Sequence, residues 1–154
     1  LSVPFHACCM WGGGSRKESV NVTEKLEGYV PLAECLDGNP GGGAPEAKRL
    51  AAAISEMHEV GLFHGNLDTS SVLVGRNDGD PIHFRGLRRA RWMRRLPGVA
   101  TRFLRGKDLA VFVDSYFDEP EGPEVQRFLK TYFDASSDTS RTRRSIRRFM
   151  GLFS

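Results

Sequence analysis

The 154-residue chain has few cysteines and no long apolar run. Cys8, Cys9 and Cys35 are odd in number and two are adjacent, so they form a poor disulfide framework and lack the spacing of a metal-binding pair. We therefore expect reduced thiols, as in a cytosolic protein. No stretch approaches the roughly 18–20 apolar residues of a membrane-spanning helix. The first residues also lack the charged start and apolar core of a signal peptide.

Acidic residues are missing from one region, between Arg85 and Lys107, which holds nine basic residues. A second basic cluster runs from Arg141 to Arg148, so the net charge of +3 hides a strong asymmetry. Such blocks attract the phosphates of nucleic acid, anionic lipid or a phosphorylated sugar, although many charge runs are only solvated faces.

Hydrophobic periodicity predicts the elements. Strands are expected before residue 12 and at 19–23, as a hairpin, then at 62–63, 72–74 and 81–84. Helices are expected at 31–36, 45–60, 106–117, 123–133 and 143–153, with a linker at 136–140. The helix at 123–133 has a clear apolar set, which comprises Val125, Phe128, Leu129, Tyr132 and Phe133.

The segment from His64 to Ser71 has the spacing of a kinase catalytic loop, in which an Asp orients the attacking hydroxyl and a later Asn holds a metal ion. In this chain Asn66 stands where the kinase pattern has its Asp; its amide can orient a hydroxyl but cannot accept the proton of that hydroxyl. Ser71 stands where the kinase pattern has its Asn, and its hydroxyl is a weak neutral ligand for a metal ion. Asp68 is the only carboxylate in this loop, and it is either a substitute base or a residue that caps a turn or meets an arginine such as Arg85.

Two histidines precede or begin this loop, His58 and His64, and we expect both to be structural. A zinc site formed with His83 would fit no standard spacing.

The order of these segments resembles the bacterial lipopolysaccharide kinase (Kdo/WaaP) family, which has a protein-kinase-like fold. The similar segments are 22–28, 57–64, 84–97, 107–110 and 127–132. The resemblance implies an α+β fold, with a mostly helical C-terminal lobe and a short β-hairpin remnant of the N-terminal lobe. It divides the chain into remnant strands and hinge at 1–28, the kinase-like lobe at 29–135, and a linker with a basic amphipathic helix at 136–154. The rest of the N-terminal lobe should precede residue 1, so we expect a truncated chain.

The resemblance also implies site residues. The adenine contacts would be the Glu24 carbonyl and the Leu26 N–H, and the metal-binding Asp would fall at His83. Asp108 would open the core helix and anchor the catalytic loop through backbone N–H groups. An anionic ligand would meet basic residues of the first cluster, namely Arg88, Arg89, Arg91, Arg94 and Arg95. ATP and Mg²⁺ are the cofactors that the resemblance implies.

The leading hypothesis is therefore a degenerate lipopolysaccharide-kinase-like domain with weak or no phosphotransfer. In active relatives the substrate would be a sugar hydroxyl of the lipopolysaccharide inner core. The alternative is a non-catalytic pseudokinase module for an anionic membrane or protein partner, attached through a C-terminal helix with arginines opposite Phe149, Leu152 and Phe153. Nucleic-acid binding has no recognisable motif behind it. We expect a cytoplasmic protein, with peripheral attachment at the inner membrane.

Overall fold

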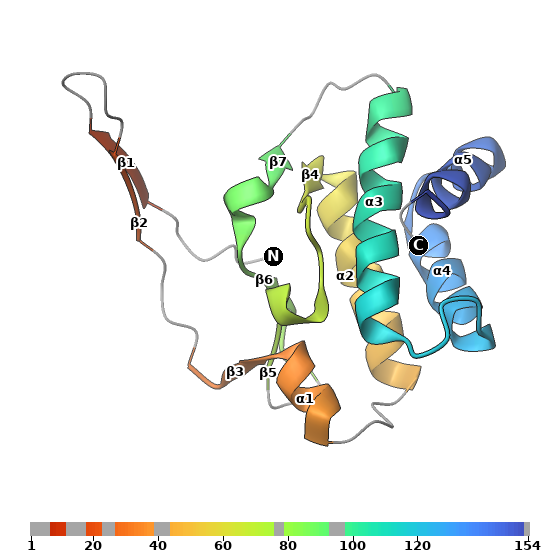
Figure 1. Ribbon diagram of the computed structural model, residues 1–154, viewed down its shortest axis with the longest axis horizontal. Helices are drawn as coiled ribbons and strands as arrows, with labels where there is room; N and C mark the ends of the chain where they lie inside the picture. Colours follow the sequence, from red (N-terminus) through yellow and green to blue (C-terminus); the bar gives the residue numbers. More distant parts are fainter. Residues whose placement is uncertain are drawn as a thin grey trace.

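We describe a computed structural model of the chain in residues 7–11, 18–22, 27–38, 44–75, 79–92 and 98–152. Strands β1 (Ala7–Trp11) and β2 (Glu18–Val22) form an antiparallel hairpin with Cys9 opposite Val20. In Figure 1 this hairpin extends away from the helical part of the molecule. The hairpin predicted from the sequence is confirmed; the turn expected at residues 12–15 lies outside the described residues.

A three-stranded antiparallel sheet has the order β3–β5–β6. Its strands are β3 (Tyr29–Pro31), β5 (Val72–Gly75) and β6 (His83–Phe84), and α1 (Leu32–Gly38) directly follows β3. Leu73 lies opposite His83, so the strands predicted at 72–74 and 81–84 are both present and pair with each other. The loop is thereby fixed at one end by a sheet.

A second small sheet pairs β4 (Leu62–Phe63) with β7 (Arg91–Trp92). The sequence predicted β4 but not β7. The short 3-10 segments η1 (Thr69–Ser71) and η2 (Leu87–Arg89) complete this half of the fold. Because β7 pairs with β4, it places Arg91 of the first basic cluster opposite Phe63, directly before the loop at residues 64–71.

Four helices form the main body, namely α2 (Ala44–Glu59), α3 (Gly98–Tyr116), α4 (Pro123–Ala135) and α5 (Ser140–Met150). In Figure 1 α3 lies between the short strands and the pair α4 and α5. The core joins α2, α3 and α4, and the rings of Phe112 and Phe128 stack at 5.4 Å between centroids. The predicted apolar set of α4 is buried in full.

The structure corrects the expected bounds of α3. This helix begins at Gly98, eight residues before the expected start, so Asp108 lies within it and does not open it. Arginines in the first turns hide the helical period of the sequence. None of the described helices is both long enough and apolar enough to cross a bilayer.

Helix α5 packs on α3 through part of its apolar face, with Ile146 and Met150 buried. The contact is tight at Gly106, where an added Cβ would lie 2.7 Å from the Cβ of Phe149. Of the residues expected to attach to a membrane, Phe149 therefore lies against α3, Leu152 is exposed, and Phe153 lies outside the described residues. Membrane attachment through this helix stays a prediction.

Candidate active-site loop and its hollows

The catalytic-loop segment, residues 64–71, is anchored by one buried carboxylate. Asp108 Oδ2 accepts a hydrogen bond from the backbone N–H of His64, and Oδ1 accepts one from the N–H of Gly65, each at 2.7 Å. These are the contacts that the family resemblance implied for Asp108. Gly65 has a φ of +80°, and a Cβ there would lie 2.7 Å from the carbonyl oxygen of Arg89. Glycine is therefore required where the backbones of the loop and of η2 meet.

His58 connects the carboxylate of Asp108 to the hydrophobic core. It is 1% exposed; its Nδ1 lies 2.8 Å from the hydroxyl of Tyr132, and its Nε2 lies 3.4 Å from Asp108 Oδ2. Burial lowers the pKa of His58 below its ordinary value, although the hydrogen bond and charge of Asp108 oppose this shift. Burial also raises the pKa of Tyr132. In the neutral state Tyr132 donates to Nδ1 and His58 Nε2–H donates to Asp108, so the network is structural.

The ring of His64 joins the loop to the segment after β6. Its Nε2–H donates to the carbonyl of Arg85 at 2.7 Å, and the backbone N–H of Arg85 donates to the carbonyl of Ser71 at 2.8 Å. The side chain of Arg85 donates through Nε to the carbonyl of Ser70. These bonds fix Arg85 beside the loop.

Asp68 and Ser71 cap η1 reciprocally. Asp68 Oδ1 accepts from the Ser71 N–H at 2.9 Å and from the Ser70 hydroxyl at 2.6 Å, while the Asp68 N–H donates to Ser71 Oγ at 3.0 Å. Asp68 Oδ2 accepts from the Asn66 amide at 3.2 Å. Partial burial would raise the pKa of Asp68, but the hydrogen bonds from Ser70 and Ser71 outweigh it and lower the pKa. The turn-cap alternative for Asp68 is confirmed, and a carboxylate held in this way is a poor proton acceptor.

The loop opens into a hollow of about 320 Å³, which we call the loop hollow. Its polar wall comes from the loop, and its cationic wall comes from Arg85, Arg88 and Arg89. Among the described residues, Asp68 is the only carboxylate that lines it, and both of its oxygens accept hydrogen bonds within the loop. In nucleotide sites Mg²⁺ is usually held by one or two carboxylates together with phosphate oxygens and water. Because Asn66 and Ser71 offer only neutral oxygens and the Asp68 carboxylate is engaged, the described lining is a poor fit to a magnesium–nucleotide site.

A larger hollow of about 590 Å³, the basic hollow, lies next to the first. Arg88 and Arg89 line both hollows. The basic hollow adds Arg91 from β7 and Lys107 from α3, with Phe63, Phe103 and Leu104 as apolar wall. The three described arginines among those predicted to meet an anion thus converge here, together with a lysine. Arg94 and Arg95, like Glu24 and Leu26, lie outside the described residues.

His83 does not reach the loop hollow. It lies on β6, and its ring packs edge-on against Tyr29 at 4.8 Å between centroids. Arg85, two residues on, lines the hollow. The sequence pattern placed the substituted metal position at His83 and offered Arg85 only as an alternative partner of Asp68, whereas Arg85 lies at the loop through bonds to Ser70, Ser71 and His64.

Arg105, a member of the first basic cluster, is structural. It is 7% exposed, and its guanidinium meets Asp138 at 2.6 Å and Glu59 at 3.0 Å. It also donates to the carbonyl of His58 at 3.4 Å. Arg105 therefore lies outside the group of arginines that was expected to meet an anionic ligand, and its charge is neutralised inside the fold.

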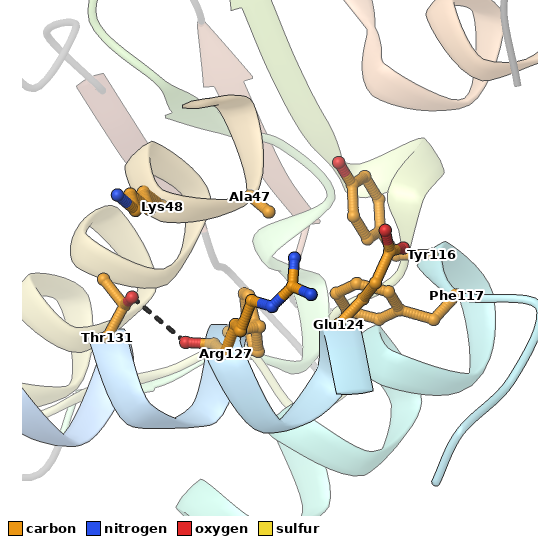
Figure 2. Close-up of a pocket in the computed structure, with 8 residues that line it drawn as sticks. Ala47, Lys48, Tyr116, Phe117, Glu124, Arg127 and Thr131 are labelled. Carbon is orange, nitrogen blue, oxygen red and sulfur yellow. Dashed lines mark hydrogen bonds between the residues drawn. The ribbon is translucent and has the colours of Figure 1, made fainter. Parts of the chain in front are cut away.

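A third hollow, of about 60 Å³, lies between α2, the end of α3 and α4 (Figure 2). Lys48 reaches it from α2, and Arg127 and Thr131 reach it from α4, where the Thr131 hydroxyl donates to the carbonyl of Arg127. Its volume holds only a few water molecules. It is therefore too small to be a candidate site for an organic ligand.

Comparison with known proteins supports the fold. No family model matches the sequence, and no curated protein matches it. Among solved structures, WaaP in complex with acyl carrier protein is similar to this chain, with a TM-score of 0.64 at 22% identity. The similarity covers 99% of this chain and 70% of that one. At this level of identity it shows a shared fold, which is consistent with the kinase-like fold expected from the sequence.

Proposed function

We propose that this chain is a degenerate lipopolysaccharide-kinase-like domain that binds a phosphate-bearing ligand in the loop hollow and transfers phosphate weakly or not at all. One observation carries the proposal: among the described residues, the hollow is lined by three arginines and a single carboxylate, whose oxygens are engaged within the loop. Phosphotransfer in kinases relies on metal ligands and on a carboxylate that orients the attacking hydroxyl. Here Asn66 and Ser71 occupy those positions, and Ser71 is taken up by the cap.

Arginine side chains explain how the chain can bind a phosphate group without catalysing its transfer. A guanidinium presents a planar fork of N–H donors that fits phosphate oxygens, and its charge needs no metal ion as intermediary. Arg85, Arg88 and Arg89 supply three such forks around one hollow. We propose that ATP or another phosphate ester binds here without Mg²⁺, with adenine contacts at Glu24 and Leu26 when the ligand is a nucleotide.

An ATP-turnover assay with Mg²⁺ tests the catalytic half of the proposal. The wild-type chain and the Asn66→Asp variant should both stay at or close to the level of the enzyme-free reaction, because a restored carboxylate at position 66 still lacks metal ligands beside it. Turnover by the wild-type chain that disappears in Asp68→Ala would contradict the proposal, since Asp68 would then be the base.

A second candidate function is a non-catalytic module for an anionic membrane or an acidic protein. The observation that favours it is that Arg144 and Arg148 are exposed on α5, as is Leu152 just after it, while Ile146 and Met150 of that helix are packed inside the fold. The similar structure is a complex with acyl carrier protein, and we propose an acidic protein of this kind as a partner. Capture on immobilised acyl carrier protein, beside flotation with anionic vesicles, tests it. The double variant Arg144→Gln/Arg148→Gln should lose whichever interaction the wild type shows.

A further inference from the structure

We propose that the loop hollow and the basic hollow together bind one small organic molecule that carries two phosphate groups. This inference rests on the proposed function of the loop hollow and adds the second hollow to it. The observation behind it is that the two hollows share a wall, formed by Arg88 and Arg89.

Backbone contacts hold the shared wall of Arg88 and Arg89 in a fixed position. Arg88 and Arg89 belong to η2, which follows Gly86 at a φ of +75°. The Ala90 N–H donates to the carbonyl of Leu87 at 3.0 Å, and the carbonyl of Arg89 rests against Gly65. Two adjacent arginines are therefore presented by a short turn that is held against the loop.

The positive charge around the two hollows indicates how many anionic groups the ligand carries. Arg85 faces the loop hollow alone, Arg91 and Lys107 face the basic hollow alone, and the two shared arginines make five cations. None of the five forms an ion pair with a residue in the described parts of the chain. A phosphate monoester carries a charge of about −1.5 to −2 near neutral pH. With Asp68 counted, one phosphate leaves an excess charge of about +2 to +2.5, whereas two phosphates reduce this excess to about 0 to +1.

The apolar wall indicates where the carbon skeleton lies. Phe63 is buried beneath the basic hollow, while Phe103 and Leu104 of α3 are partly exposed along it. The hollow of about 590 Å³ has room for more than a phosphate group. The ligand class is thus a small organic bisphosphate, with one phosphate on each side of the Arg88 and Arg89 wall.

Isothermal titration in EDTA tests the inference, with fructose 1,6-bisphosphate and fructose 6-phosphate as probes. The wild-type chain should bind the bisphosphate about tenfold more tightly or better, because a second set of charge-assisted hydrogen bonds forms. Arg85→Gln, in the loop hollow, and Lys107→Gln, in the basic hollow, should each remove most of this advantage. Lys130→Gln, an exposed lysine of α4, makes the same change in net charge and should leave it intact.

The outcomes separate this inference from the proposed function. Equal affinity for the two sugars, with both weakened by Arg85→Gln, would overturn the bridging ligand and leave the loop hollow as a phosphate site. Bisphosphate binding that depends on Lys107 and not on Arg85 would also overturn bridging. If neither sugar phosphate nor ATP binds, both proposals fall.

Discussion

The carboxylate of Asp108 accepts the backbone N–H of His64 at 2.7 Å, across 44 positions of sequence. The bond joins the middle of α3 to the first residue of the catalytic loop. It involves only the carboxylate of Asp108 and a backbone N–H of the loop, so it requires neither a metal ion nor the side chain of Asn66. Under the proposed function, this contact holds the loop in place without phosphotransfer.

Asp108→Asn should loosen this loop. An amide can accept only one of the two N–H groups, and it turns an N–H donor toward the other. We expect the free energy of unfolding to fall by about 1–3 kcal/mol, as for a buried polar group without a partner. Hydrogen exchange at the amides of His64 and Gly65 should accelerate more than exchange in α4. Unchanged protection of both amides would contradict the anchor.

Acid should destabilise the fold through His58. Burial lowers its pKa in the folded state, so below about pH 6.5 the unfolded chain takes up a proton that the folded chain refuses. Stability is full above this value and falls as the pH drops toward the lowered pKa. Urea unfolding at about pH 7.5 and about pH 5.5 measures the loss, which should be smaller in His58→Gln. An equal loss in both proteins would assign the effect to other groups.

The packing of α5 on α3 predicts opposite effects for two glycines of one helix. Gly106→Ala places a methyl group 2.7 Å from the Cβ of Phe149 and should lower the free energy of unfolding by about 1–3 kcal/mol. Gly98→Ala, on the same helix, meets no atom within 4 Å and should be neutral or slightly stabilising. Thermal unfolding compares the pair; similar changes in melting temperature would count against the close contact.

Two neighbouring cations of the first basic cluster should behave differently. Arg105→Gln leaves the partly buried carboxylate of Asp138 without its partner and should cost about 3 kcal/mol or more of stability. Lys107→Gln should change stability by less than about 0.5 kcal/mol, because this side chain makes no ion pair with any described residue. Urea unfolding of the two variants decides this, and equal destabilisation would refute the division into structural and ligand-facing cations.

The hydrophobic periodicity of the sequence was sufficient to predict the helices and strands that have one apolar face. The apolar set of α4 follows from the spacing of Val125, Phe128, Leu129, Tyr132 and Phe133, all of which are buried. Strand β7 could not be predicted, because Arg91 and Trp92 are both exposed and carry no alternation. The early start of α3 was hidden for a similar reason, since arginines interrupt its apolar pattern.

The candidate site was predictable where it depends on loop spacing and hidden where it depends on distant contacts. The loop positions Asn66, Asp68 and Ser71 follow from the sequence and converge on one hollow. The burial of Arg105 depends on Glu59 and Asp138, far from it in sequence, so a basic cluster cannot reveal it. The place of Arg85 depends on bonds made by His64 and Ser71, which only the tertiary structure brings together.

The central claim is that arginines, and not a metal ion, hold the phosphate in the loop hollow. Isothermal titration of the wild-type chain with ATP, once in EDTA and once in excess Mg²⁺, tests it most directly, with Arg85→Gln as the matched variant. We predict binding in EDTA that added Mg²⁺ does not strengthen, and a loss of affinity of about tenfold in Arg85→Gln. Binding that requires Mg²⁺, or that is the same in Arg85→Gln as in the wild-type chain, would contradict the account.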